Sequence, residues 1–323
     1  MPPHLTQWLA PALDALRAGT GKPCLMGLHG STAGFGLALL TPGAPANALA
    51  GRSWLVVAKT DDDAERLYRD TLFFRTLCGL PGDDLALFPK WETLPYESTV
   101  PHIDLVARRM QTLHRLCTTP RTVLFTAIPA LMQRVLPALV FSDAILPFRP
   151  NGSLEREALV SSLLRLGYRK SSVVEIPGEF SIRGGIVDIY STAYPDPLRV
   201  EFLGDTIESL RFFDPATQKS TDKIKQAWLL PARELIRPED AADALAPLSA
   251  DAEWHAPSVY GTMDSLLDYF PQPPILVLDQ PNALKAHNAE CWEAIQEGYL
   301  RHEDRTDPNP YPTPDQLYFT WDQ

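Results

Sequence analysis

The residues best placed to do chemistry lie in the stretch LMGLHGSTAGFGLALL, residues 25–40, which has the outline of a phosphate-binding loop. Such a loop needs backbone N–H groups turned inward by glycines, a lysine that reaches the β- and γ-phosphates, and a hydroxyl residue that binds Mg²⁺. Aligned on Gly27, the stretch also has Gly30 inside the loop, but Thr32, Ala33 and Gly34 stand where the second glycine, the lysine and the hydroxyl residue belong. Taken alone, the stretch is better explained as an ordinary Gly-rich turn between a strand and a helix, because such turns are common in α/β domains.

A second stretch has the shape of the other half of a nucleotide site. The apolar run Ile275-Leu276-Val277-Leu278 is followed by Asp279 and then Gln280. In a P-loop enzyme the corresponding strand ends in Asp-Glu, where the aspartate serves Mg²⁺ and the glutamate polarises the attacking water. An amide cannot accept the proton of that water as a carboxylate can. Two elements thus keep the outline of one ATPase without its catalytic groups, so we predict a degenerate P-loop fold with no catalytic residue, no cofactor and no metal site.

The elements that must position these stretches alternate between strands and helices. Apolar runs predict buried strands at 53–60, 85–89, 121–127 and 275–278, and amphipathic segments predict helices at 61–74 and 103–116. The acids Asp61, Asp62 and Asp63 fit the first turn of a helix better than a metal site. A further strand before Gly27 and a helix after it are expected. Such alternation predicts a parallel sheet covered by helices on both faces.

The pattern changes near Pro147, where short β-branched and aromatic runs follow one another with Gly, Pro and Asp between them. These runs predict an antiparallel sheet with one exposed face, preceded by a helix that Ser153 caps and containing a hairpin turn at Gly204-Asp205. We therefore expect an α/β fold with an inserted α+β domain. Its predicted parts are 1–147, a first domain with the degenerate Walker A loop; 148–232, the inserted domain; and 233–323, which returns to the first sheet with the degenerate Walker B strand.

Composition limits the possible functions. The 323 residues include 29 basic and 40 acidic side chains, a net charge of −11 that disfavours salt-dependent binding to nucleic acid. Trp91 and Tyr96 are therefore expected to pack in the protein rather than to stack on bases. The four cysteines lack the spacing of a zinc site, and no run suits a signal peptide or a membrane span, so a cytoplasmic location is expected. Residues 237–253 are predicted to be a surface helix or linker, and the Pro-rich residues 303–323 a linker outside the core.

The longest motifs resemble bacterial excision-repair proteins. SLLDYFPQPPILVLDQP (265–281) is similar to the UvrB segment that leads into its Walker B strand. PGEFSIRGGIVDIY (177–190) and LRVEFLGDTIESLRFFDPATQKS (198–220) resemble the inserted domain that UvrB shares with the N-terminal part of the transcription-repair coupling factor family, Mfd. Mfd is the closer match for two reasons. The stretches LFPKWETLPYESTVPHIDLVARRMQTLHRL and LMQRVLP resemble sequences typical of Mfd. Mfd, unlike UvrB, also has degenerate Walker elements. Between Pro101 and Arg108 there is no room for the long β-hairpin with which UvrB grips damaged DNA. The resemblance covers roughly Pro23 to Tyr318.

The resemblance implies a non-catalytic module that binds UvrA and so recruits nucleotide excision repair to an RNA polymerase stalled at a DNA lesion. In intact members of the family, other domains bind RNA polymerase and form an ATP-dependent translocase on double-stranded DNA, and a C-terminal domain masks the UvrA-binding face. The alternative is a UvrB-type repair protein that binds ATP and DNA. For this chain we expect a monomer with no membrane association.

The resemblance also implies which residues bind UvrA. In the family, arginines and an aromatic residue around a GEFxxRGG motif make this contact, and the matching positions here are Arg169, Arg183, Glu179, Phe180 and Tyr190. Strand alternation supports Arg183 as an exposed residue, because it shares a face with Ser181 while Ile182 faces the core. The opposing interpretation is that Arg183 only pairs with Glu179 or Glu201 on the sheet and that Phe180 belongs to the core.

Overall fold

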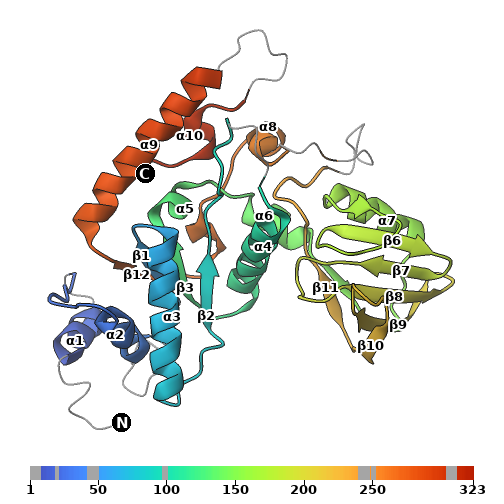
Figure 1. The fold of residues 1–323 in the computed structure, drawn as a ribbon, viewed down its shortest axis with the longest axis horizontal. Coiled ribbons are helices and arrows are strands. Elements are labelled where there is room, and N and C mark those ends of the chain that lie inside the picture. Colours follow the sequence, from blue (N-terminus) through green and yellow to red (C-terminus); the bar gives the residue numbers. More distant parts are fainter. Residues whose placement is uncertain are drawn as a thin grey trace.

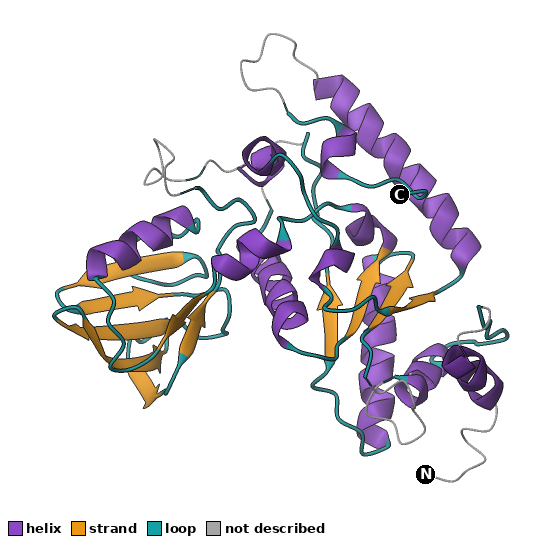
Figure 2. Ribbon diagram, turned by 180° about the vertical axis from the view of Figure 1, so that it is seen from behind, coloured by secondary structure: helices purple, strands orange, loops and turns teal. Residues whose placement is uncertain are grey.

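The computed structural model describes residues 9–18, 22–41, 51–96, 101–238, 248, 252–302 and 311–323. Figure 1 shows a parallel sheet with helices around it and, beside it, a second sheet that carries a single helix. The same two sheets appear from behind in Figure 2. The fold is mixed α/β, as the sequence predicts.

The parallel sheet has four strands in the order β12-β1-β3-β2. Its strands are β1 (Trp54–Ala58), β2 (Leu85–Phe88), β3 (Val123–Ala127) and β12 (Ile275–Leu278). All three neighbouring pairs are parallel, with Trp54 opposite both Ile275 and Val123. The four predicted strands therefore form one sheet, although β12 is more than 140 residues away from β3 in the sequence.

Helices cover both faces of this sheet. On one face, Trp54 and Val56 of β1 pack with α3 (Asp61–Leu77) and α2 (Thr32–Leu40), and on the other Leu55 and Val57 pack with α4 (Ile103–Thr118). Thr60 caps α3 by accepting the N–H of Asp63, and three acids follow in the first turn, which suits the positive end of the helix dipole. Burying each large apolar side chain here stabilises the fold by about 1.5–3 kcal/mol.

The second sheet has six strands in the order β10-β9-β8-β7-β6-β5. They are β5 (Arg169–Lys170), β6 (Glu179–Arg183), β7 (Ile186–Ile189), β8 (Leu198–Leu203), β9 (Thr206–Phe213) and β10 (Ser220–Lys223). The sheet is antiparallel except for β5, which pairs parallel to β6. Gly204 takes a positive φ of 61° in the β8–β9 turn, where the sequence predicts a hairpin. Helix α7 (Arg156–Arg165) packs on one face through Leu159 and Leu163.

A short ribbon joins the two sheets. Strand β4 (Leu146–Phe148) leads into the six-stranded sheet, β11 (Ala227–Leu229) leads out of it, and the two pair antiparallel. Five residues after β11, Glu234 pairs with Arg109 of α4: Arg109 Nε donates to Glu234 Oε1 at 2.5 Å, and both side chains are buried. The chain thus leaves the parallel sheet for the six-stranded sheet and returns to it at β12, while the bounds 148–232 for the inserted domain stay a prediction.

The remaining helices pack around the parallel sheet. They are α1 (Ala10–Ala18), α5 (Ile128–Met132), α6 (Ala138–Asp143), the 3₁₀ turns Ala252–His255 and Leu266–Tyr269, α8 (Ala256–Tyr260), α9 (Pro281–His302) and α10 (Pro314–Leu317). Helix α9 is the longest and runs along the outside of the molecule (Figure 1). Among the described helices, none is both long and apolar enough to cross a bilayer.

Three local expectations are wrong. Residues 22–29 form no strand before α2, and the Met26 side chain is 87% exposed, so this stretch lacks the sheet pairing that a Walker A strand requires. Ser153 does not cap α7, because the helix begins three residues later at Arg156 and Ser153 instead bridges to Thr206. Most of the predicted helix or linker at 237–253 lies outside the described residues.

The third wrong expectation concerns residues 311–323. The sequence predicts a linker outside the core at 303–323, but Leu317 and Tyr318 are buried, and Tyr318 forms a β-bridge with Gln133. Thr313 and Gln316 form a capping box for the short helix α10. The Thr-x-x-Gln spacing of that box is a helix-start signal that could have been found in the sequence.

Candidate partner-binding face of the six-stranded sheet

The end of the degenerate phosphate loop, where α2 begins, packs against α3. Gly27 and Gly30 have positive φ angles of 75° and 55°, and the Thr32 hydroxyl donates to the His29 carbonyl at 2.7 Å. Ala33 packs on the apolar cluster that contains α2 and α3. A Cβ atom at Gly34 would collide with the Asp70 side chain of α3. The hydroxyl residue that Mg²⁺ requires would therefore not fit between these two helices.

The degenerate Walker B residues end a strand and begin a helix. The Asp279 N–H donates to the Val57 carbonyl at 2.9 Å, and burial raises the pKa of the Asp279 carboxyl above its usual value, with Arg66 opposing the shift. Gln280 has a positive φ of 53°, and its carbonyl accepts the N–H groups of Ala283 and Leu284 at the start of α9. These hydrogen bonds are made by backbone atoms, so the junction of β12 and α9 forms without a nucleotide.

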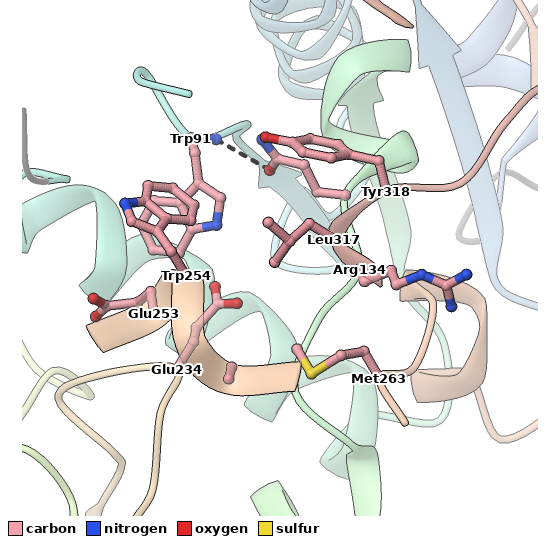
Figure 3. Close-up of a pocket in the computed structure, with 10 residues that line it drawn as sticks. Trp91, Arg134, Glu234, Glu253, Trp254, Met263, Leu317 and Tyr318 are labelled. Atoms are coloured by element: carbon pink, nitrogen blue, oxygen red, sulfur yellow. Dashed lines mark hydrogen bonds between the residues drawn. The ribbon is translucent and has the colours of Figure 1, made fainter. Parts of the chain in front are cut away.

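A small pocket lies near the buried Arg109–Glu234 pair. Trp91 and Trp254 meet edge to face at its wall, and Glu234, Glu253 and Tyr318 also line it (Figure 3). Its volume is about 20 Å³. That is room for about one water molecule, far too little for a nucleotide. Trp91 is buried here as expected, as is Tyr96 in a neighbouring cluster.

The charged residues of the six-stranded sheet gather on the face opposite α7. Phe180 and Val187 point toward α7 and are fully buried, so residues one position away in the strands point the other way. On this outer face the register pairs Glu179 with Arg169. It also forms a row across five strands: Ser181, Asp188, Arg199, Arg211 and Lys223. Arg183 lies on the same face of β6, two positions after Ser181. Strand pairing therefore brings together residues that are up to 54 positions apart in the sequence.

Asp188 holds two arginines on this face. Arg183 Nη2 lies 2.5 Å from Asp188 Oδ2, and Arg199 donates to both carboxylate oxygens at 2.7 and 3.0 Å. The Asp188 side chain is fully buried, whereas that of Arg183 is 48% exposed. Arg199 also lies over the Phe213 ring at 4.7 Å, and its hydrogen bonds to Asp188 raise its pKa. A buried carboxylate thus fixes an exposed guanidinium in one orientation.

Glu179 fixes Arg169 in the same way. Arg169 Nη2 donates to Glu179 Oε1 at 2.8 Å, while Oε2 accepts the N–H groups of Glu175 and Ile176 at 3.1 and 3.3 Å. The Glu179 side chain is 9% exposed and that of Arg169 is 68% exposed. Glu179 is therefore a positioning residue, and Arg169 is the group that a partner can reach.

The other predicted site residues differ in their access to solvent. Phe180 is fully buried on the α7 side, so its predicted contact with a partner is not supported and its contribution is to packing. Tyr190 is half-buried, its hydroxyl donates to the Pro195 carbonyl at 2.6 Å, and burial raises its pKa. The opposing interpretation pairs Arg183 with Glu179 or Glu201, but in the structure Arg183 pairs with Asp188.

The sequence reasoning missed Asp188 and Arg199. Asp188 lies between the buried apolar residues Val187 and Ile189, so strand alternation alone could have placed it on the outer face. Its pairing with Arg199 depends on the register between β7 and β8, which the sequence does not state.

Comparisons with known proteins place these features in a family. Residues 146–235 match the model of the UvrB interaction domain, a span that contains all six strands of the second sheet. The chain is 31% identical to the transcription-repair-coupling factor of Myxococcus xanthus over 92% of its own length and 27% of the relative. The chain is a UvrB-like N-terminal module of the transcription-repair-coupling factor family.

Other relatives agree with this assignment. The module is 38% identical to the transcription-repair-coupling factor of Escherichia coli (strain K12) over 47% of this chain and 13% of that protein. It is 29% identical to the factor of Haemophilus influenzae over 77% of this chain and 24% of the relative. The chain thus spans about a quarter or less of the length of these relatives. Its match to the UvrB interaction domain includes Arg169 and Arg183.

Proposed function

We propose that this module binds UvrA through the outer face of the six-stranded sheet and thereby recruits nucleotide excision repair to an RNA polymerase stalled at a DNA lesion. The observation that carries the proposal is the exposed Arg183 guanidinium, held by the fully buried Asp188 in a domain that matches the UvrB interaction domain. Arg169, held by Glu179, is the second proposed contact.

The chemistry of Arg183 suits a carboxylate on the partner. Within the described part of the chain, only its Nη2 atom makes hydrogen bonds, to Asp188 and Gln218, so Nε and Nη1 remain available. A guanidinium presents parallel N–H groups that match a carboxylate, and arginine is enriched among the residues that dominate binding energy at interfaces. Because Asp188 already orients the side chain, less conformational entropy is lost on binding.

The proposed role requires no catalysis by this module. The lysine and hydroxyl residue of the phosphate loop are replaced by Ala33 and Gly34, and the catalytic glutamate by Gln280. In the longer proteins of the family, we propose that other domains contact RNA polymerase, translocate on DNA with ATP, and mask this face until the polymerase is engaged.

Calorimetric titration of the purified module with UvrA tests the binding proposal. Arg183→Ala should weaken binding at least tenfold, because truncation of an arginine at the centre of an interface costs roughly 2 kcal/mol or more of binding free energy. Arg301→Ala is a matched control, since Arg301 is an exposed arginine of α9 that pairs with Glu297 at 2.8 Å. Equal effects of the two substitutions would reject Arg183 as a contact, and absence of binding by the unmodified module would reject the function.

A further inference from the structure

The outer face carries a row of cations that the Arg183 and Arg169 contacts do not explain. Arg199 of β8 lies directly opposite Arg211 of β9, and Arg211 lies opposite Lys223 of β10. Opposite residues of an antiparallel pair point to the same face with Cβ atoms about 5 Å apart. Three positive side chains therefore lie side by side across β8, β9 and β10, and β10 is the edge strand opposite β5, which carries Arg169. Figure 1 shows β10 at the edge of this sheet.

The acids on this face compensate only part of its positive charge. Asp188 is shared by Arg183 and Arg199, and Glu179 pairs with Arg169. Glu201 is a further negative charge near Arg199 and accepts the Ser209 hydroxyl at 2.5 Å. Neither Arg211 nor Lys223 forms an ion pair with any residue that the structure describes, although Lys223 is exposed and Arg211 half-buried. Like charges placed directly opposite each other destabilise a sheet. The row thus reduces the stability of the fold, which points to a role outside the fold.

We infer that Arg211 and Lys223 extend the UvrA-binding face across β9 and β10, where they bind carboxylates of an acidic patch on UvrA. The inference rests on the proposed function and adds the residues that widen its site. From β6 to β10 the face spans four strand spacings, roughly 19 Å. An acidic protein surface of that length would meet Arg183 at one end and Lys223 at the other.

A protein carboxylate fits this row better than a nucleic-acid backbone. The chain has a net charge of −11, and the buried carboxylates of Asp188 and Glu179 lie between the cations on the same face. A continuous polyanion would pass close to those acids, whereas separate carboxylates can each meet one cation.

Charge reversal at Arg211 separates binding from folding. Arg211→Glu places an acid between Arg199 and Lys223, so the melting temperature should equal or exceed that of the unmodified module. The same substitution should weaken UvrA binding about tenfold by calorimetric titration, because a like charge then faces the partner's acids. Lys223→Glu should weaken binding in the same direction, and both losses should shrink as salt concentration rises.

Lys285→Glu of α9 is the matched control, since it changes the net charge by the same amount at an exposed lysine outside the row. The inference is overturned if Arg211→Glu and Lys223→Glu bind UvrA like this control while Arg183→Ala still weakens binding. It is also overturned if they leave UvrA binding unchanged but abolish binding to a DNA duplex measured by fluorescence anisotropy. A module that does not bind UvrA at all overturns both this inference and the proposed function.

Discussion

The two sheets of this module place their arginine–carboxylate pairs differently. Beside the parallel sheet, Arg109 and Glu234 are both buried, with side chains 0% and 4% exposed. On the six-stranded sheet only the acid is buried: Asp188 is 0% exposed and its partner Arg183 is 48% exposed. A pair with both members buried can serve only the fold, whereas a pair with one exposed cation also leaves that cation accessible to a partner. The difference supports the proposal that the second sheet carries the interaction while the first serves as its scaffold.

Breaking the fully buried pair should have the largest effect on stability. Glu234→Ala leaves Arg109 buried without its carboxylate, so we expect the free energy of unfolding to fall by about 3–5 kcal/mol. Urea unfolding followed by circular dichroism measures this loss. UvrA affinity per folded molecule should not change, because Glu234 lies outside the outer face. A loss below 1 kcal/mol, roughly, would show that the Trp91 and Phe88 rings that contact Arg109 can hold it without the acid.

Breaking the half-exposed pair should affect stability less and binding more. Asp188→Asn removes the charge that fixes Arg183 and Arg199, and we expect a loss of about 2 kcal/mol in unfolding free energy together with weaker UvrA binding. A double-mutant cycle with Arg183→Ala separates positioning from general damage. If Asp188 acts through Arg183, Asp188→Asn should cost little further affinity once Arg183 is alanine. Additive losses would contradict the positioning role.

The degenerate loop offers a test of the scaffold itself. Gly34→Ser restores a hydroxyl at the metal-binding position but forces α2 away from Asp70 on α3, so we expect destabilisation by about 2 kcal/mol. ATP titration of the variant in the presence of Mg²⁺ should still give no binding, because the lysine remains absent. Gly51→Ser, at an exposed glycine with open space around it, is the control for changing glycine to serine. Equal stability of the two variants would contradict the packing role of Gly34.

The sequence predicts the four strands of the parallel sheet and β6 to β9 of the second sheet, because each is a short apolar or alternating run whose burial its own residues determine. It does not predict β5 or β10, which are short and exposed. It also places Arg183 on the outer face, since alternation needs only the neighbours Ser181 and Ile182. The role of Asp188 could not be read, because it depends on the pairing of β7 with β8, a contact between distant residues. The packing of Gly34 on Asp70 was missed for the same reason: spacing reveals a missing hydroxyl group, but not the helix that occupies its place.

The smallest expected effect concerns Asp279, which makes no ion pair among the described residues and so contrasts with Asp188. Burial raises the pKa of Asp279, with Asp63 adding to the shift and Arg66 opposing it. A carboxyl whose pKa is raised on folding costs no stability below its unfolded-state pKa, where it is neutral in both states, and its full cost is present above the folded-state pKa. Asp279→Asn should therefore raise the melting temperature slightly near neutral pH, and the gain should shrink as the pH falls toward 4, roughly.

Melting curves of the two proteins between neutral and acidic pH measure this difference. Asp83→Asn, at an exposed position, makes the same change in net charge and serves as the control for it. A gain that grows on acidification would mean that Asp279 is stabilised as a carboxylate in the folded protein. The end of β12 would then use its acid as the six-stranded sheet uses Asp188, and the contrast between the two sheets would no longer hold at this position.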